Sequence, residues 1–172
     1  MEQNLLILGA GIYGDLAGEI ARSMGVFQRI AFVDDRAAQT ANGCPVIGTT
    51  EDLPALAGEF THAVVAIGNP AVREKLLGRI VEETSLELAT LISPAAYVSP
   101  SARIGAGCVI EPMSVVHTAA VLGKGCLICA GAVVNHAAVC GDFVQVDCNA
   151  TVAGNISVPA GSKIPSGTVC RG

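Results

Sequence analysis

The chain has few aromatic residues and no long apolar stretch. Phe, Tyr and Trp make up 3% of its 172 residues, and Trp is absent, although hydrophobic residues reach 51%. The apolar content is therefore Ala, Val, Ile and Leu, which suits thin, repeated layers better than one bulky core. No apolar run approaches the roughly 18 residues of a membrane span. Because the first residues, MEQNLLILGAG, also lack the basic start of a secretory signal, we expect a cytoplasmic protein without a membrane span.

Basic residues and paired cysteines are also scarce. The formal net charge is -5, so the sequence lacks the electrostatic footprint of a nucleic-acid-binding protein. The cysteines number seven, an odd count, and without a secretory signal they indicate reduced thiols rather than a disulfide framework. Cys126 and Cys129 form a C-x-x-C motif, but no second pair follows at zinc-finger spacing. We therefore expect no metal site.

The first half of the chain alternates strand-like and helix-like segments. The expected strands are 5–10 (LLILGA), 29–35 (RIAFVDD) and 61–68 (THAVVAIG), and the expected helices are 15–25 and 69–83. Strands that alternate with helices predict βαβ units and a parallel sheet. We therefore expect a small Rossmann-like α/β domain over residues 1–92.

A glycine-rich turn joins the first expected strand to the first expected helix. It reads GAGIYG, a G-x-G-x-x-G motif formed by Gly9, Gly11 and Gly14. Such a turn lets backbone N–H groups approach a phosphate at a helix N-terminus. Asp34 follows Gly14 by 20 residues, at the place of a ribose-binding acid. The motif favours nucleotide binding, with NAD as one candidate only, although tight strand–helix turns also need glycine for packing.

The second half has a period of six residues. Twelve hexapeptides run without interruption from residue 98 to 169, beginning VSPSAR, IGAGCV and IEPMSV. The first position is Val, Ile or Leu in all but one of them, where it is Cys140, and the fifth is mostly small. The fourth position is Gly or Asn in seven repeats, and these residues tolerate positive φ at a corner.

A hexapeptide repeat predicts a parallel β-helix, in which three hexapeptides make one triangular coil. The twelve repeats then give about four coils, with first- and fifth-position side chains in the interior. Such a prism exposes flat faces and open ends, so it needs partners or caps. We expect a homotrimer. His136 is the third residue of its repeat, VNHAAV, and therefore lies outside near a corner, one coil before Gly154.

Several segments resemble, in order, those of the bacterial hexapeptide-repeat sugar acyltransferases, which include sialic-acid O-acetyltransferases and UDP-4-amino-sugar N-acetyltransferases. They are LILGAGIYG, AFVDD, VVAIGN, LISPAAYVSPSARIGAG, and AGAVVNHAAVCGDFVQV followed by AGN. The resemblance covers nearly the whole chain. It implies a Rossmann-like sugar-nucleotide-binding domain followed by a left-handed parallel β-helix over residues 93–172.

The resemblance also implies a reaction and its residues. His136 matches the histidine of a V-x-H-x-x-x-x-G-D segment, the family's general base, which would act on an amino or hydroxyl group that attacks acetyl-CoA. The backbone N–H of Gly154 would stabilise the oxyanion, and Gln145 and Gly154 would contact acetyl-CoA between neighbouring β-helices. The nucleotide sugar, with a UDP-amino sugar favoured, would contact Gly9, Gly11, Tyr13, Gly14, Asp34, Asp35, Gly68 and Asn69.

The sequence departs from the family pattern at three positions and in length. Ala137 stands where an acidic residue often orients the base, so Asn135 or a neighbouring subunit would have to fix the imidazole tautomer. Tyr13 and Gln145 stand where histidines are common, and the four coils are fewer than usual. An alternative is therefore a sugar-nucleotide-binding or assembly protein on the same trimeric scaffold. An O-acetyltransferase of a sialic-acid-like sugar and, more distantly, an NAD-dependent oxidoreductase are further alternatives.

Overall fold

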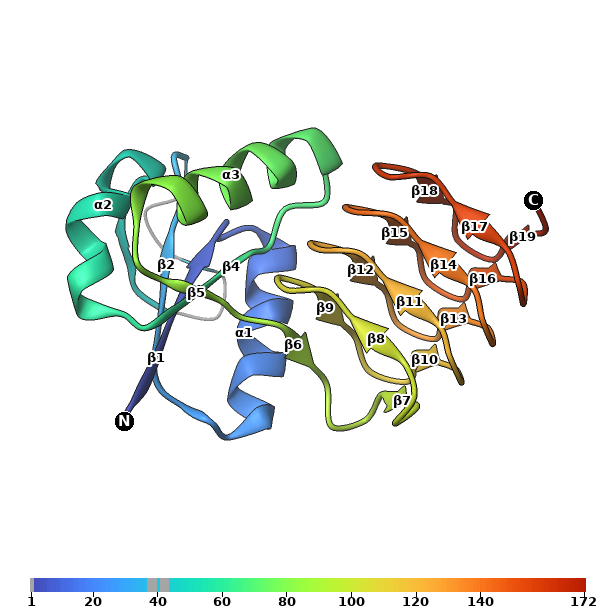
Figure 1. Cartoon of the computed structure of the whole chain (residues 1–172). Coiled ribbons are helices and arrows are strands. Elements are labelled where there is room, and N and C mark those ends of the chain that lie inside the picture. The colour runs from blue at the N-terminus through green and yellow to red at the C-terminus, as the bar shows by residue number, and fades with distance from the viewer. Residues whose placement is uncertain (1, 37–39, 41–43) are drawn as a thin grey trace. The chain divides into compact units, whose positions relative to one another are not determined.

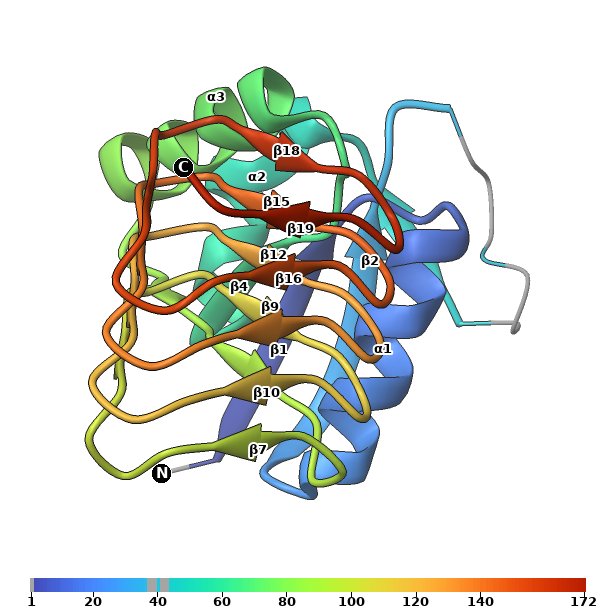
Figure 2. The same cartoon turned by 90° about the vertical axis from the view of Figure 1, so that its right-hand side faces the viewer.

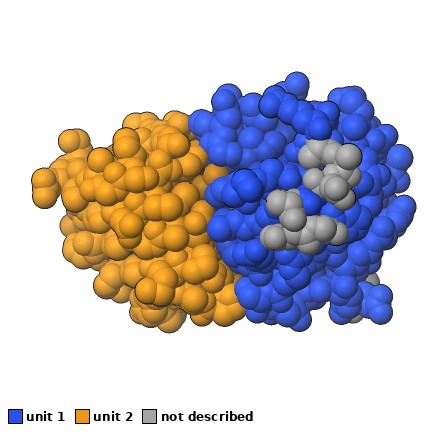
Figure 3. All heavy atoms as spheres, turned by 180° about the vertical axis from the view of Figure 1, so that it is seen from behind, with its two compact units in different colours: residues 1–91 blue, residues 92–172 orange. Residues whose placement is uncertain are grey.

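A computed structural model describes residues 2–36, 40 and 44–172 of the chain. The chain divides into two compact units, residues 1–91 and 92–172, which Figure 3 shows in blue and orange. The sequence predicted a boundary after residue 92. No helix in the described part of the chain is both long enough and apolar enough to cross a bilayer.

The first unit contains one five-stranded parallel sheet (Figure 1). Its strand order is β3-β2-β1-β4-β5, and each neighbouring pair is parallel. The strands are β1 (Gln3–Leu8), β2 (Phe27–Val33), β3 (Val46–Gly48), β4 (His62–Val65) and β5 (Glu87–Leu88). The predicted α/β class is confirmed, but the short edge strands β3 and β5 were not predicted from the sequence.

Helices α1 (Ile12–Met24), α2 (Leu53–Leu56) and α3 (Pro70–Glu83) connect the strands, with short 3-10 turns at Thr50–Asp52 and Ala57–Glu59. Helix α1 begins directly after the extended Gly11, three residues earlier than predicted. Helix α3 begins one residue after its predicted start, because Asn69 caps it and accepts hydrogen bonds from Ala71 and Val72 N–H at 3.0 and 3.2 Å. Pro70, at the first helical position, has the required φ and no N–H to satisfy.

The second unit is a left-handed parallel β-helix built from two-residue strands. One sheet holds β7 (Tyr97–Val98), β10 (Val115–Val116), β13 (Val133–Val134), β16 (Thr151–Val152) and β19 (Val169–Cys170). A second holds β8 (Arg103–Ile104), β11 (Val121–Leu122), β14 (Val139–Cys140) and β17 (Ser157–Val158). The third holds β6 (Leu91–Ile92), β9 (Val109–Ile110), β12 (Leu127–Ile128), β15 (Gln145–Val146) and β18 (Lys163–Ile164). Figure 2 shows the stacked coils.

The strand register confirms the 18-residue coil. Val115 pairs with Val133 and Val133 with Thr151, so each residue lies beside the one three hexapeptides later. First- and fifth-position side chains such as Val134 and Ala138 fill the interior, where both are fully buried. The repeat also begins one hexapeptide earlier than the sequence analysis placed it, since Ile92 packs against this core.

The corners of the coils have left-handed backbone at the fourth position of the hexapeptide. From the repeat at residue 104 onward, every fourth position has positive φ, whereas the sequence indicated Gly or Asn at only seven positions. The other four are Met113, Ala119, Ala137 and Phe143, with φ between 53° and 63°. The stacked ladder therefore imposes this conformation even on residues that disfavour it.

Candidate functional site

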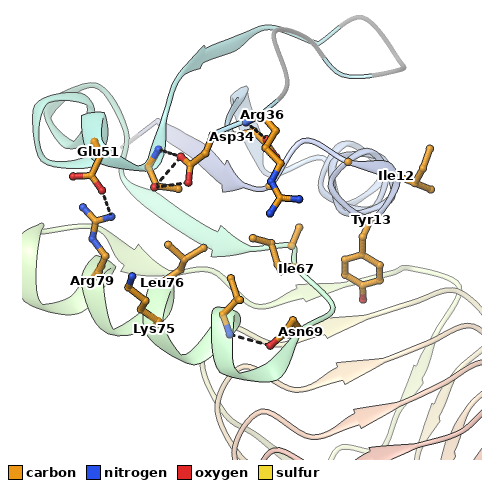
Figure 4. A pocket seen from close by; sticks show the side chains of 16 residues that line it. Ile12, Tyr13, Asp34, Arg36, Glu51, Ile67, Asn69, Lys75, Leu76 and Arg79 are labelled. Carbon is orange, nitrogen blue, oxygen red and sulfur yellow. Dashed lines mark hydrogen bonds and ion pairs between the residues drawn. The ribbon is translucent and has the colours of Figure 1, made fainter.

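A cavity of about 710 Å³ opens in the first unit, at the carboxyl ends of its strands (Figure 4). Ligands commonly bind at this edge of an open parallel sheet, where the strand order reverses. The cavity is lined by six of the eight residues that the sequence analysis assigned to a nucleotide sugar: Gly9, Gly11, Tyr13, Asp34, Asp35 and Asn69. The structure therefore gathers most of that predicted set around one space.

The other two predicted residues, Gly14 and Gly68, do not line the cavity. A Cβ atom on Gly14 would collide with the carbonyl oxygen of Gly9, so glycine here allows α1 to pack closely on the end of β1. The Gly68 carbonyl accepts a hydrogen bond from Arg73 Nη1 at 3.1 Å. In the structure Gly14 therefore serves helix packing, and Gly68 contributes a carbonyl acceptor to Arg73.

The two carboxylates predicted to bind base or ribose are both bonded to the protein backbone. Asp34 accepts hydrogen bonds from the N–H groups of Ala10 and Arg36, at 2.7 and 2.8 Å. Asp34 therefore holds the glycine-rich loop in place. Asp35 Oδ1 accepts from the N–H and the hydroxyl of Thr50, at 2.8 and 2.9 Å, and so fixes the start of the 3-10 turn at Thr50–Asp52.

Basic side chains that the sequence analysis missed line the same cavity. In Figure 4, Arg36 points inward from the loop after β2, and Lys75 and Arg79 lie on α3. Neither Arg36 nor Lys75 makes an ion pair with another described residue. For the two on α3 a signal was present in the sequence, because Lys75 and Arg79 recur with Val72 and Leu76 at helical spacing along one face of α3.

Arg79 differs from the other two cations because carboxylates hold it on two sides. Its Nε and Nη2 donate to Glu83 at 2.8 and 3.0 Å, and its Nη1 donates to Glu51 at 3.1 Å. The hydrogen bond to Glu83, more than the charge of Glu51, raises the pKa of Arg79 above its ordinary value. The guanidinium is therefore a fixed donor at the cavity edge.

His136 lies at an exposed corner of the second unit, between β13 and β14. Its imidazole packs directly against Gly154, one coil further along. A Cβ atom built on Gly154 would lie only 2.6 Å from Cε1, 2.7 Å from Nε2 and 3.0 Å from Nδ1 of His136. Only glycine leaves room for the ring in this position, so the structure brings together the two residues that the sequence analysis made catalytic.

The hydrogen bonds at this corner leave both groups available for chemistry. Asn135 Oδ1, a candidate partner for the ring, instead accepts from the backbone N–H of His136 at 2.7 Å. Within the described chain, no hydrogen bond joins the imidazole to another residue, and the Gly154 N–H makes none either. One ring nitrogen is therefore available to accept a hydrogen bond from a ligand, and the Gly154 N–H can donate to an external oxygen.

Gln145 does not join this corner within one chain. It lies in β15 on the third sheet of the β-helix, whereas the His136 corner connects the other two sheets. Its side chain is buried, and Nε2 donates to Asp147 Oδ1 at 2.6 Å. The predicted acetyl-CoA contacts, Gln145 and Gly154, are therefore on separate sides of one prism.

Comparisons with known proteins agree with this two-part architecture. Residues 4–80 match the family model described as the PglD N-terminal domain, and residues 101–136 match that of the bacterial transferase hexapeptide, six repeats. No curated protein sequence matches the chain.

Solved structures include relatives over nearly the whole chain. The acetyltransferase domain of PglB from Neisseria gonorrhoeae is 35% identical with a TM-score of 0.93, over 98% of this chain and 82% of that one. The same domain was also solved with acetyl coenzyme A, at the same identity and TM-score. PerB from Caulobacter crescentus, in complex with CoA and GDP-perosamine, is 27% identical with a TM-score of 0.71, over 96% and 90%. The chain belongs to the family of bacterial hexapeptide-repeat sugar acyltransferases.

Proposed function

We propose that this protein transfers an acetyl group from acetyl-CoA to an amino group of a nucleotide-linked sugar, with His136 as general base. The packing of an exposed His136 against Gly154 is the observation that carries the proposal. It is supported by the PglB acetyltransferase domain, which resembles this chain over 98% of its length and was solved with acetyl coenzyme A.

The chemistry follows from the two groups at the corner. The sugar amine attacks the thioester carbonyl, and one imidazole nitrogen of His136 takes the proton that the amine loses. The tetrahedral oxyanion accepts a hydrogen bond from the Gly154 N–H. When the intermediate collapses, the C–S bond breaks, the imidazolium returns its proton to the thiolate, and the products are the N-acetyl sugar and CoA.

The cavity of the first unit suits the nucleotide part of such a substrate. Gly11 precedes the first residue of α1, where the positive end of the helix dipole favours a phosphate, and Gly9 lies in the same loop. Arg36 and Lys75 add positive charge from opposite walls. The family resemblance favours a UDP-amino sugar, whereas PerB was solved with GDP-perosamine, so both nucleotides belong in the first assay.

A homotrimer would complete the acetyl-CoA site. On the sheet that contains β13, one row of side chains is apolar except for Thr151, and two of its members, Tyr97 and Val169, are about half exposed. The row is Tyr97, Val115, Val133, Thr151 and Val169. Such a row suits contact with another copy of the chain. Because Gln145 lies away from His136 in one prism, a neighbouring subunit could supply it. Light scattering after gel filtration would detect the trimer.

The proposal is tested by incubating the protein with acetyl-CoA and UDP- or GDP-linked amino sugars. The N-acetylated product is detected by mass spectrometry, because thiol-release assays would be confused by seven cysteines. A sialic-acid-like sugar in the same panel tests O-acetylation. Transfer to at least one nucleotide-linked amine is expected, and no transfer to any member of the panel would contradict the proposal.

Two observations favour a second candidate, a protein that binds sugar nucleotides without transfer. Ala137 supplies no carboxylate beside His136, and no described residue hydrogen-bonds the imidazole. Titration calorimetry with acetyl-CoA separates the candidates. The enzyme should bind about one molecule per subunit, whereas binding of UDP or GDP without acetyl-CoA binding would favour the second candidate.

A further inference from the structure

The cavity of the first unit has two chemically different ends. Helix α3 runs along it, and two lining residues, the N-cap Asn69 and Arg79, are ten positions apart, or about 15 Å at 1.5 Å per residue. This length suits an extended nucleoside diphosphate. The glycine-rich loop and the N-terminus of α1 lie at one end, where the phosphates would bind. Glu51 and Arg79 lie at the other end, as Figure 4 shows.

We propose that Glu51 and Arg79 read the hydrogen-bonding edge of the nucleobase and so select the nucleotide. The proposal rests on the proposed nucleotide-sugar function of the same cavity. Uracil and guanine each present a ring N–H beside a carbonyl oxygen. A carboxylate accepts from that N–H, and a guanidinium donates to that oxygen, so the pair is complementary to either base.

Glu51 is positioned to act as an acceptor. Asp35 fixes the backbone immediately before it, through the two hydrogen bonds to Thr50. Only one Glu51 oxygen is bonded, to Arg79 Nη1 at 3.1 Å, and the side chain is 83% exposed. The second oxygen is therefore available to a ligand.

Arg79 is positioned to act as the paired donor. Glu83 holds its Nε and Nη2, so the guanidinium loses little further conformational freedom when a base binds. Its side chain is 18% exposed, whereas the Glu51 side chain is largely in solvent. A base whose ring nitrogen carries a lone pair, as in cytosine and adenine, would set that lone pair against the Glu51 carboxylate.

The test measures binding of UDP, GDP, CDP and ADP by titration calorimetry, for wild type and for Glu51→Gln. We expect UDP or GDP to bind wild type at least about tenfold more tightly than CDP and ADP, which corresponds to roughly 1.4 kcal/mol. In Glu51→Gln the ratio between the affinity for UDP or GDP and the affinity for CDP or ADP should shrink several-fold. The reason is that the glutamine amide can donate a hydrogen bond as well as accept one.

Glu82→Gln is the matched control, because Glu82 is an exposed carboxylate of α3 that does not line the cavity. It should keep the wild-type ratio, and thermal melts should show that both variants are folded. Equal binding of all four nucleotides, or an unchanged ratio in Glu51→Gln, would overturn the inference while leaving the proposed function in place. If none of the four nucleotides binds wild type, the cavity is not a nucleotide site. That result would contradict both the proposed nucleotide binding and this inference.

Discussion

Gly154 offers a direct way to displace the proposed catalytic base without removing it. In Gly154→Ala the new Cβ would lie 2.6 to 3.0 Å from three atoms of the His136 ring, whereas carbon atoms in contact lie about 3.5–4.0 Å apart. The ring must therefore move by roughly 1 Å. A misplacement of about 1 Å can reduce a rate on the order of 10²-fold. We therefore expect kcat for acetyl transfer to fall about 10- to 100-fold.

The fold should tolerate this change. Gly154 has no positive φ, so alanine meets no backbone strain, and the exposed His136 can move into solvent. Gly78→Ala is the matched control, because a Cβ at this position in α3 meets nothing within 4 Å. It should keep full activity and gain slightly in helix stability. A folded Gly154→Ala enzyme with activity within twofold of wild type would refute the proposed role of the His136 position.

Three other predictions concern binding, reactivity and stability. Asp34→Asn should weaken nucleotide binding roughly tenfold by calorimetry, because a single amide oxygen cannot replace both acceptors that hold Ala10 and Arg36; unchanged affinity would contradict this. Mass spectrometry after alkylation should show the exposed Cys148 modified before Cys140, whose pKa burial raises to about 12. Because the unfolded thiol ionises near pH 9, the same shift should lower stability between about pH 9 and 12. Met113→Asn should raise stability by about 0.5–1 kcal/mol in thermal melts, because asparagine tolerates φ of 63° better, whereas Met113→Ala should not.

The β-helix was predictable from the sequence because its period is directly readable. Each hexapeptide repeats the same environment, so the positions of Val134, Ala138 and His136 follow from counting alone. The corner conformation was only partly predictable. Met113 and Phe143 adopt positive φ because the neighbouring coils fix the backbone, and no local propensity indicates this.

In the first unit the sequence predicted the three central strands of the sheet but not its two edge strands. Strand β1 was predicted because Leu5–Leu8 form a continuous apolar run, the pattern of a strand covered on both faces. In the structure all four side chains are fully buried. Strands β3 and β5 contain only three and two residues, too few for a periodic pattern. They depend on pairing with β2 and β4, which is a property of the folded sheet.

The sequence predicted most of the residues that line the candidate site, but not what each side chain does there. The G-x-G-x-x-G motif predicted nucleotide binding, and the structure has a cavity beside Gly9 and Gly11. It could not show that Asp34 would bond to the loop itself, or that Arg79 would face the same cavity, because both depend on tertiary placement. The contact between His136 and Gly154 followed from their 18-residue spacing.

The most direct test of His136 as the general base compares acetyl transfer by wild type and His136→Asn, measured as acetylated sugar nucleotide by mass spectrometry. Asparagine keeps a polar side chain at the corner but cannot take a proton near neutral pH. We expect kcat to fall by about 10²–10⁴-fold while acetyl-CoA and nucleotide binding are unchanged, as the role of His136 as general base requires. Wild-type activity in a folded, ligand-binding His136→Asn protein would contradict it.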